Sequence, residues 1–261
     1  MTQVSDTVVA GRHWAPPNGV AVRGSVLLLP GRGEHAGVYE RFGHRLAADG
    51  YRVHALDGIA PDNLDIVARA VRDINGSAPV VLVGADIGAL QALVVAAGGG
   101  ITLAGLLLAG IPPTGPAAGA AADLGAMDWA DELDVRTACP VHQARLTDDS
   151  AVVRGQLATP IPANLAGAVH RLNLTDLAVP TLLLHGTADV IATLTGARAF
   201  AARLPNAELA IVNGGRHDIL NDAQHRTVAA HVTQWLERLR ISPDAAPILT
   251  VERAIPRGGT Q

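Results

Sequence analysis

The segment at residues 80–96, VVLVGADIGALQALVVA, decides the fold that this sequence predicts. It begins with a Val/Leu run typical of a buried strand, and it ends in an apolar helical pattern. Gly84 and Gly88 stand where a turn is so tight that a Cβ atom would clash. A helix that begins at Ile87 would aim its free N–H groups at the side chain of Asp86. The segment therefore predicts a strand–turn–helix unit that presents Asp86 at the end of a strand.

The same alternation of strand and helix extends along most of the chain. Strands are expected at residues 25–29, 52–56, 80–83, 103–108, 181–184 and 208–212. Helices are expected at 39–49, 62–74, 87–97, 195–204 and 222–239, where Val228, Val232, Trp235 and Leu239 share one face of the last helix. Continuous apolar strands that alternate with helices predict an α/β fold with a mainly parallel sheet covered on both faces.

The alternation lapses between residues 112 and 178, where the chain is first rich in Gly, Ala and Pro and then polar. Helical fragments are expected there at 150–157 and 161–172. An insertion of this size predicts a cap over the strand ends. We therefore expect an α/β core made of 1–111 and 179–240, a cap at 112–178, and a loosely attached extension at 241–261.

Composition excludes several classes of function. The 261 residues carry a net charge of −4 with 17% charged residues, so there is no basic excess for holding a nucleic acid. The uncharged stretch 87–122 is long enough for a membrane span, but Gly98–Gly100 and the prolines after Ile111 interrupt it. The single Cys139 excludes an intramolecular disulfide, and the N-terminus lacks the pattern of a signal peptide. We expect a cytoplasmic protein with a small-molecule substrate, no nucleic-acid or membrane partner, and a homodimer as one option for its assembly.

Other polar residues follow the remaining strands. Asp189 comes just after the strand at 181–184, and His217 comes just after the strand at 208–212. The glycine turn Gly31-Arg32-Gly33 follows the first strand. Ligands bind at the carboxyl ends of parallel strands, so these groups are expected to meet. Asp86, Asp189 and His217 occur in the order nucleophile, acid, histidine, and the backbone N–H groups of Arg32 and Ile87 could form an oxyanion hole beside Gly31.

These motifs resemble the α/β-hydrolase superfamily, and within it the monoacylglycerol lipase/lysophospholipase-like branch. The resemblance rests on LPGRGEHAGVYERFG (29–43), VVLVGADIGALQALVVA (80–96), VPTLLLHGTADVI (179–191) and VNGGRHDILND (212–222). It covers roughly 25–110 and 179–239 and implies an α/β-hydrolase fold and a hydrolase activity. Two departures stand out: Pro30 replaces the His usual in the His-Gly-x-Gly turn, and Asp86 replaces the nucleophilic Ser.

An aspartate at the nucleophile position changes the expected chemistry. A carboxylate is a poor acyl-transfer nucleophile, because it would form an anhydride, but it can displace a leaving group from sp³ carbon. The resulting ester would be cleaved by water that His217, oriented by Asp189, activates. Dehalogenases and epoxide hydrolases of the superfamily work in this way. However, the epoxide hydrolases present two cap tyrosines to their substrate, and this cap contains no tyrosine.

The cap offers only partial equivalents of such donors, namely Trp129, His142 and Arg145. No cofactor is implied. A metal site is not expected, because the spacing of His142, His170, His225 and His231 fits no ligand motif. Three hypotheses stay open: a hydrolase with Asp86 as covalent nucleophile, a non-covalent acid–base lyase or cyclase, and a catalytically degenerate esterase-like binding protein.

Overall fold

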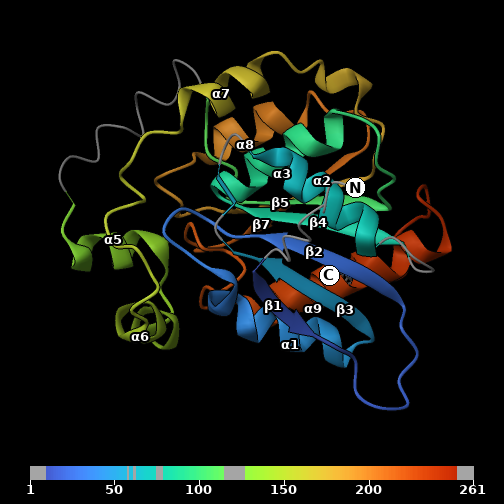
Figure 1. Cartoon of the computed structure of the whole chain (residues 1–261), viewed down its shortest axis with the longest axis horizontal. Coiled ribbons are helices and arrows are strands. Elements are labelled where there is room, and N and C mark those ends of the chain that lie inside the picture. The colour runs from blue at the N-terminus through green and yellow to red at the C-terminus, as the bar shows by residue number, and fades with distance from the viewer. Residues whose placement is uncertain (1–9, 58, 61–62, 75–78, 115–126, 252–261) are drawn as a thin grey trace, which may run out of the picture.

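One twisted sheet runs through the molecule and separates two layers of helices (Figure 1). The computed structural model describes residues 10–57, 59–60, 63–74, 79–114 and 127–251. Within these residues seven strands pair in the order β1-β3-β2-β4-β5-β6-β7. Only the pairing of β1 with β3 is antiparallel. The strands are β1 (Gly11–Trp14), β2 (Gly24–Leu29), β3 (Tyr51–Leu56), β4 (Val80–Ala85), β5 (Gly105–Ala109), β6 (Thr181–Gly186) and β7 (Ala207–Val212).

The register of the sheet brings the predicted motifs to one edge. Leu29 at the end of β2 pairs with Gly84 near the end of β4. The last residue of β4, Ala85, pairs with Ala109 at the end of β5. Gly186 of β6 pairs with Val212 of β7. Because these strands are parallel, the loops that follow β2, β4, β6 and β7 all lie at the carboxyl ends of the strands.

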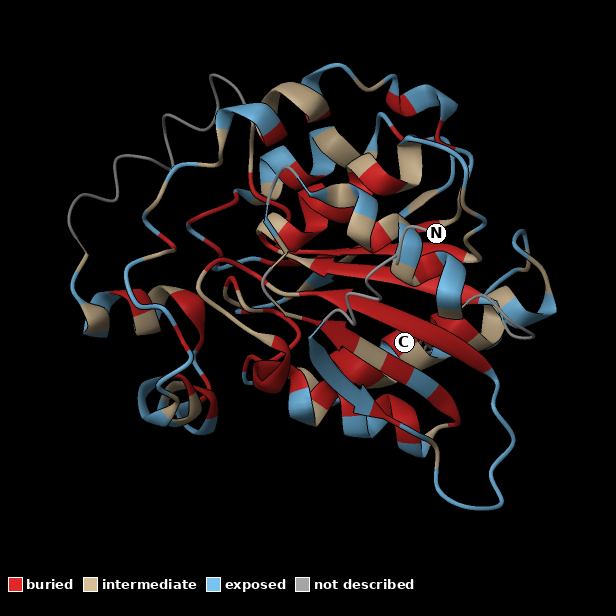
Figure 2. Cartoon of the chain, in the orientation of Figure 1, coloured by how far each residue is buried: buried red, intermediate tan, exposed pale blue. Residues whose placement is uncertain are grey.

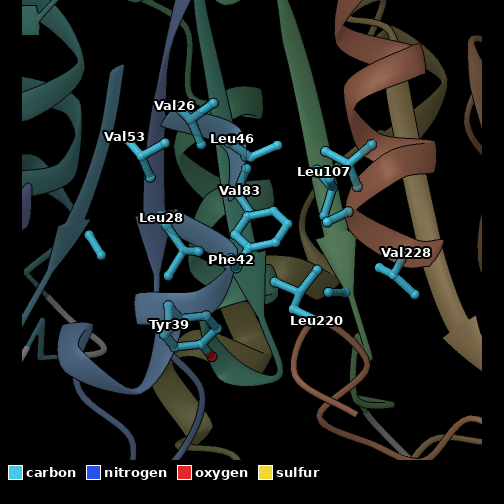
Figure 3. Close-up of a cluster of buried hydrophobic side chains, with 14 of the residues drawn as sticks. Val26, Leu28, Tyr39, Phe42, Leu46, Val53, Val83, Leu107, Leu220 and Val228 are labelled. Atoms are coloured by element: carbon cyan, nitrogen blue, oxygen red, sulfur yellow. The ribbon is translucent and has the colours of Figure 1, made fainter. Parts of the chain in front are cut away.

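Side chains that alternate along the central strands divide the core into two clusters. Val26 and Leu28 of β2 join one cluster, whereas Leu27 and Leu29 join the other. Figure 3 shows part of the first cluster, where Phe42 and Leu46 pack over Val26 and Leu28. All residues of β2, β5 and β6 are buried, so the middle of the sheet is red in Figure 2. Burial on both faces explains why these strands are continuously apolar.

Helices cover both faces of the sheet (Figure 1). On one face lie the short 3₁₀ helix η1 (Ala36–Tyr39), α1 (Glu40–Ala48) and α9 (His225–Ile241); on the other lie α2 (Leu64–Ile74), α3 (Ile87–Ala97) and α8 (Leu194–Ala201). In α9, Val228, Val232 and Trp235 are buried and Leu239 packs against them, as its periodicity predicted.

The inserted segment contains α5 (Trp129–Arg136), α6 (Pro140–Asp148), α7 (Ala163–His170) and the 3₁₀ helix η2 (Leu174–Asp176). Helices α5 and α6 lie beyond one end of the sheet in Figure 1, whereas Leu165 and Val169 of α7 join the second core cluster. The helix expected at 150–157 is wrong, because turns occupy these residues. The Val153 N–H donates to the carbonyl oxygen of Gly33 at 2.9 Å, and Gly155 has a positive φ of 78°, both incompatible with a helix through these residues.

Three further elements were not predicted, and the bounds of several predicted elements differ by a few residues. Strand β1 was not predicted, nor were α5 and α6, and the helix expected at 161–172 is shorter, as α7. Helix α3 matches its expected bounds, while α8 and α9 are displaced by a few residues. The long uncharged stretch forms α3 and β5, both parts of the core, although residues 115–122 lie outside the described part of the chain. Among the described residues no helix has the length and hydropathy needed to cross a bilayer.

Replacing Trp235 by Ala tests the packing of α9 on the sheet. Trp235 is 3% exposed, and a Cβ atom on Gly105 of β5 would lie 2.7 Å from its indole ring. We expect Trp235→Ala to lower the free energy of unfolding by about 3–5 kcal/mol, measured by urea denaturation. Ile241→Ala, at a position that is 69% exposed, serves as the control and should change it by no more than about 0.5 kcal/mol. Equal effects of the two changes would contradict this account of the core.

Candidate active site

Asp86 stands on a strained turn between β4 and α3. Its φ of 48° is positive, and among the described residues no other residue except glycine has a positive φ. A Cβ atom at Gly84 would lie 2.1 Å from the carbonyl oxygen of Gly88, and one at Gly88 would lie 2.3 Å from that of Leu29. The prediction that this turn excludes side chains at both positions is confirmed. The turn places the buried Asp86 side chain at the N-terminus of α3.

His217 lies between two carboxylates. Its Nε2 is 3.2 Å from Asp86 Oδ1, and its Nδ1 is 2.9 Å from Asp189 Oδ2. The other oxygen of Asp189 accepts the N–H groups of Ile191 and Ala192, both at 2.9 Å, so its carboxylate has a fixed orientation. The three residues come from loops after β4, β6 and β7, and the structure brings them together in the expected relay.

The electrostatics of the three residues favour the charged forms. Burial opposes the charge of His217, but the carboxylates of Asp189 and Asp86 outweigh it and raise the pKa of His217 to about 10. Burial also opposes the charge of Asp86, but Arg32 and His217 hold its pKa well below the usual range. The site therefore contains an imidazolium ion hydrogen-bonded to two carboxylates.

Arg32 holds Asp86 through both its backbone and its side chain. The Arg32 backbone N–H and Nε donate to Asp86 Oδ2 at 2.9 and 2.8 Å, and Nη2 donates to Oδ1 at 2.9 Å. The third guanidinium nitrogen, Nη1, donates to the carbonyl oxygen of Thr159 at 2.5 Å. The side chains of Arg32 and Asp86 are only 9% and 4% exposed, so this is a buried, bidentate ion pair.

The sequence predicted a role for the backbone N–H of Arg32 but missed its side chain. The loop motif indicates where the backbone lies, but the direction of a long flexible side chain depends on tertiary contacts. The other two residues of the expected oxyanion hole lie beside Asp86. Ile87 is the first residue of α3, and a Cβ atom on Gly31 would lie 3.2 Å from Asp86 Cβ.

The three cap residues expected to face a substrate lie apart from one another. Trp129 Nε1 donates to Thr147 Oγ1 at 3.3 Å, and Arg154 stacks on its ring. Arg145 binds Glu40 and the carbonyl oxygen of Gly37, both at 3.0 Å, and so ties α6 to the core.

His142, the third of these residues, is buried, and its Nε2 lies 3.4 Å from Asp218 Oδ2, next to the catalytic candidate His217. None of the contacts described for Trp129, His142 or Arg145 is with Asp86. Their roles as substrate contacts stay predictions.

An apolar cavity of about 290 Å³ lies beside the Asp189 loop. The residues around it include Leu90 of α3, Ile111 after β5, Ile191 and Phe200. Its volume is at the lower end of the range for ligand pockets. Such a cavity could accommodate the apolar part of a small molecule.

Comparisons with known proteins agree with the fold. A model of the Hydrolase_4 family, described as serine aminopeptidase, S33, matches residues 20–59 and 60–224. A monoglyceride lipase from Saccharomyces cerevisiae, solved with a substrate analog, is 20% identical with a TM-score of 0.72, over 88% of this chain and 91% of that one.

Two further solved structures have similar scores. A monoacylglycerol lipase from Paleococcus ferrophilus is 20% identical with a TM-score of 0.70, over 87% of this chain and 98% of that one. A proline iminopeptidase from Mycobacterium smegmatis is 16% identical with a TM-score of 0.67, over 90% and 96%. No curated protein sequence matches the chain.

The ion pair between Arg32 and Asp86 can be tested by a double-mutant cycle. Arg32→Met leaves a buried carboxylate without its main counter-ion, so we expect it to lower the free energy of unfolding by about 3–5 kcal/mol. In an Asp86→Asn background the same change should cost much less, because no buried charge is left unpaired. Urea denaturation of the four proteins measures the coupling. Additive effects of the two changes would mean that the ion pair contributes nothing.

Proposed function

The chain belongs to the Hydrolase_4 family of hydrolases (serine aminopeptidase, S33), and we propose that in it Asp86, in place of serine, is the covalent nucleophile. The observation that carries this proposal is the relay in which His217 lies 3.2 Å from Asp86 and 2.9 Å from Asp189. Residue 86 has the strained backbone and the helix N-terminus that suit a nucleophile. The fold supports a hydrolase with a nucleophile at this turn, but it does not identify the substrate.

The two oxygens of Asp86 suit different tasks in this mechanism. Oδ2 lies against the backbone N–H and Nε of Arg32, which are placed like the donors of an oxyanion hole. We therefore assign the attack to Oδ1. Its lone pair forms a bond to an sp³ carbon of the substrate while the leaving group departs with the electrons of the broken bond. For this step Nη2 of Arg32 has to release Oδ1, which it contacts at 2.9 Å.

The second step returns Asp86 to its starting state. Water attacks Cγ of the ester and transfers a proton to His217, while Asp189 orients the imidazole. The bond between Cγ and Oδ1 then breaks, and Oδ1 takes the proton from His217 and leaves in the alcohol product. Esterification removes the negative charge of Asp86, one of the two carboxylates that raise the pKa of His217. Loss of this charge lowers the pKa of His217, so its extra proton passes to solvent or to the leaving group. The neutral imidazole that results can accept the proton of the attacking water.

The substrate class follows from the nucleophile and the cavity. A carboxylate nucleophile suits carbon–halogen bonds and epoxides, as proposed from the sequence. The apolar cavity lies beside the Asp189 loop and is not lined by Asp86 or His217, but it could hold the apolar body of a small substrate. We place the selection of this substrate in the cap expected at 112–178, because Thr159 of this segment binds Arg32 and thereby contacts the site.

A second candidate function is favoured by the three hydrogen bonds that Arg32 donates to Asp86. Both oxygens of the carboxylate are occupied, and the backbone donor expected for an oxyanion already binds Asp86 itself. This arrangement suits a site in which Asp86 forms no covalent bond, either an acid–base lyase or cyclase or a binding protein without turnover.

Isotope labelling tests the covalent route. We expect single-turnover reactions in H₂¹⁸O, with small alkyl halides and epoxides as substrates, to place ¹⁸O in the carboxylate of Asp86, because the product leaves with the original Oδ1. Mass spectrometry of the peptide that contains Asp86 measures the label, with Asp86→Asn as the control. Turnover without label in this peptide contradicts the covalent route and favours acid–base chemistry. Ligand binding without any turnover favours the binding protein.

Replacing His217 by Gln separates the two steps. The first step does not need a base, so Asp86 should still be alkylated, but hydrolysis of the ester should slow by a factor on the order of 10³–10⁴. Intact-protein mass spectrometry should detect an adduct with the mass of the substrate minus its leaving group, or of the whole molecule for an epoxide. The double variant Asp86→Asn, His217→Gln should carry none. An adduct in both proteins would place the reaction elsewhere.

A further inference from the structure

A second group of titratable side chains lies beside the relay, and the proposed reaction does not use it. Glu34 comes from the loop after β2, His142 from α6, and Asp218 from the loop before α9. Each offers one atom able to bind a metal ion, and these atoms lie within 4.8 Å of one another. The three residues are far apart in the sequence and belong to three separate segments, which is why no spacing motif indicated them.

Each of the three side chains has a buried polar atom without a hydrogen-bond partner. These atoms are Glu34 Oε1, His142 Nε2 and Asp218 Oδ2. The side chains of His142 and Asp218 are 1% and 5% exposed. His142 Nε2 and Asp218 Oδ2 lie 3.4 Å from each other, which is ion-pair distance but too long for a good hydrogen bond. A buried polar group without a hydrogen bond costs about 1–3 kcal/mol, so this grouping needs an explanation.

The remaining atoms of these carboxylates are satisfied and fix their orientation. Glu34 Oε2 accepts the Tyr39 hydroxyl and the Gly31 N–H. Asp218 Oδ1 lies 3.4 Å from Nη1 of Arg136. The unpaired atoms of Glu34 and Asp218 are therefore the ones left to bind another group.

The charges around this group are unbalanced. Arg136 is buried and forms ion pairs with both Glu132 and Asp218. The negative charge of Glu34 also helps to raise the pKa of Arg136. One guanidinium thus lies among three carboxylates, and His142 and His217 are the other basic groups that act on Asp218. Buried charges need compensation, and a divalent cation would add positive charge where these carboxylates meet.

We propose that Glu34, His142 and Asp218 form a binding site for a divalent transition-metal cation of the Zn²⁺ type. One imidazole nitrogen and two carboxylate oxygens are a donor set that such ions accept. The distance of 3.4 Å between His142 Nε2 and Asp218 Oδ2 matches the separation of about 3.4 Å that tetrahedral bonds of 2.0–2.2 Å give. Water would complete the coordination.

The position of this site gives it a structural role. The ion would connect α6 of the cap with the loop that contains Arg32 and with the loop that contains His217. The Arg136 side chain already links these loops, since its Nη2 donates to the carbonyl oxygen of Arg32 at 2.7 Å. The metal would thus stabilise the cap on the two loops that hold Asp86.

Metal content and thermal stability test the proposal on the whole protein. The protein is loaded with Zn²⁺, desalted and analysed by inductively coupled plasma mass spectrometry, and we expect one ion per chain and a higher unfolding temperature than after treatment with EDTA. Substitution with Co²⁺ should give the visible absorption of a low-symmetry site. His142→Ala should lower the affinity for Zn²⁺ at least about tenfold. Loss of a residue that only hydrogen-bonds to a metal ligand already costs that much, and His142 would be a ligand itself.

The controls keep the outcome clear. His44→Ala removes a histidine that is 68% exposed, and it should retain the ion. His142→Gln keeps the size of the side chain and replaces His142→Ala if circular dichroism shows that the latter is unfolded. Wild-type protein that retains no ion, folded His142 variants that bind Zn²⁺ as wild type does, or equal loss of the ion in His44→Ala would each overturn the proposal.

Discussion

The ion pair between Arg32 and Asp86 organises the centre of this protein. A carboxylate on a strained turn, inside the protein and at the end of a parallel strand, has to be compensated, and Arg32 does this with three donors. His217 adds a fourth donor, and Asp189 compensates His217 in turn. The site is thus a chain of alternating charges, each of which depends on its neighbours. Loss of one member leaves the next one buried and unpaired.

The same principle applies on the other side of the Arg32 loop. Glu132, Arg136 and Asp218 are buried charges that lie between the cap and the core. Glu132 is also bound by the Gly155 and Leu157 N–H groups, so the turn after α6 closes over it. These polar contacts act beside an apolar interface, because Leu146 and Val152 join the first core cluster and Leu133 packs against it. Helix α7 attaches through apolar side chains in the second core cluster.

How far the sequence predicts the structure depends on the range of the interactions. The turn around Asp86 is predictable because its determinants, Gly84 and Gly88, are adjacent in the chain and act through sterics. The strands and α3 follow from apolar runs that burial on both faces requires. Helices α5 and α6 escape prediction because they bury polar residues. Glu132 and Arg136 pair within α5, but their further partners, such as Asp218 and the carbonyl oxygen of Arg32, lie in distant segments of the sequence. For the same reason no pattern indicates the grouping of Glu34, His142 and Asp218, or the direction of the Arg32 side chain.

The hydrogen bond from Arg32 Nη1 to the carbonyl oxygen of Thr159 makes one side chain depend on both the position of this turn and the position of Asp86. Thr159 belongs to the turn after α6, while the other nitrogens of the same planar guanidinium hold Asp86. Because the guanidinium is planar and rigid, a displacement of the Thr159 backbone that Nη1 follows also changes the hydrogen bonds of Nε and Nη2 to Asp86. Any ligand that lifts this turn therefore also loosens the carboxylate. We therefore expect that entry of a molecule beneath this turn and release of the buried oxygen are coupled.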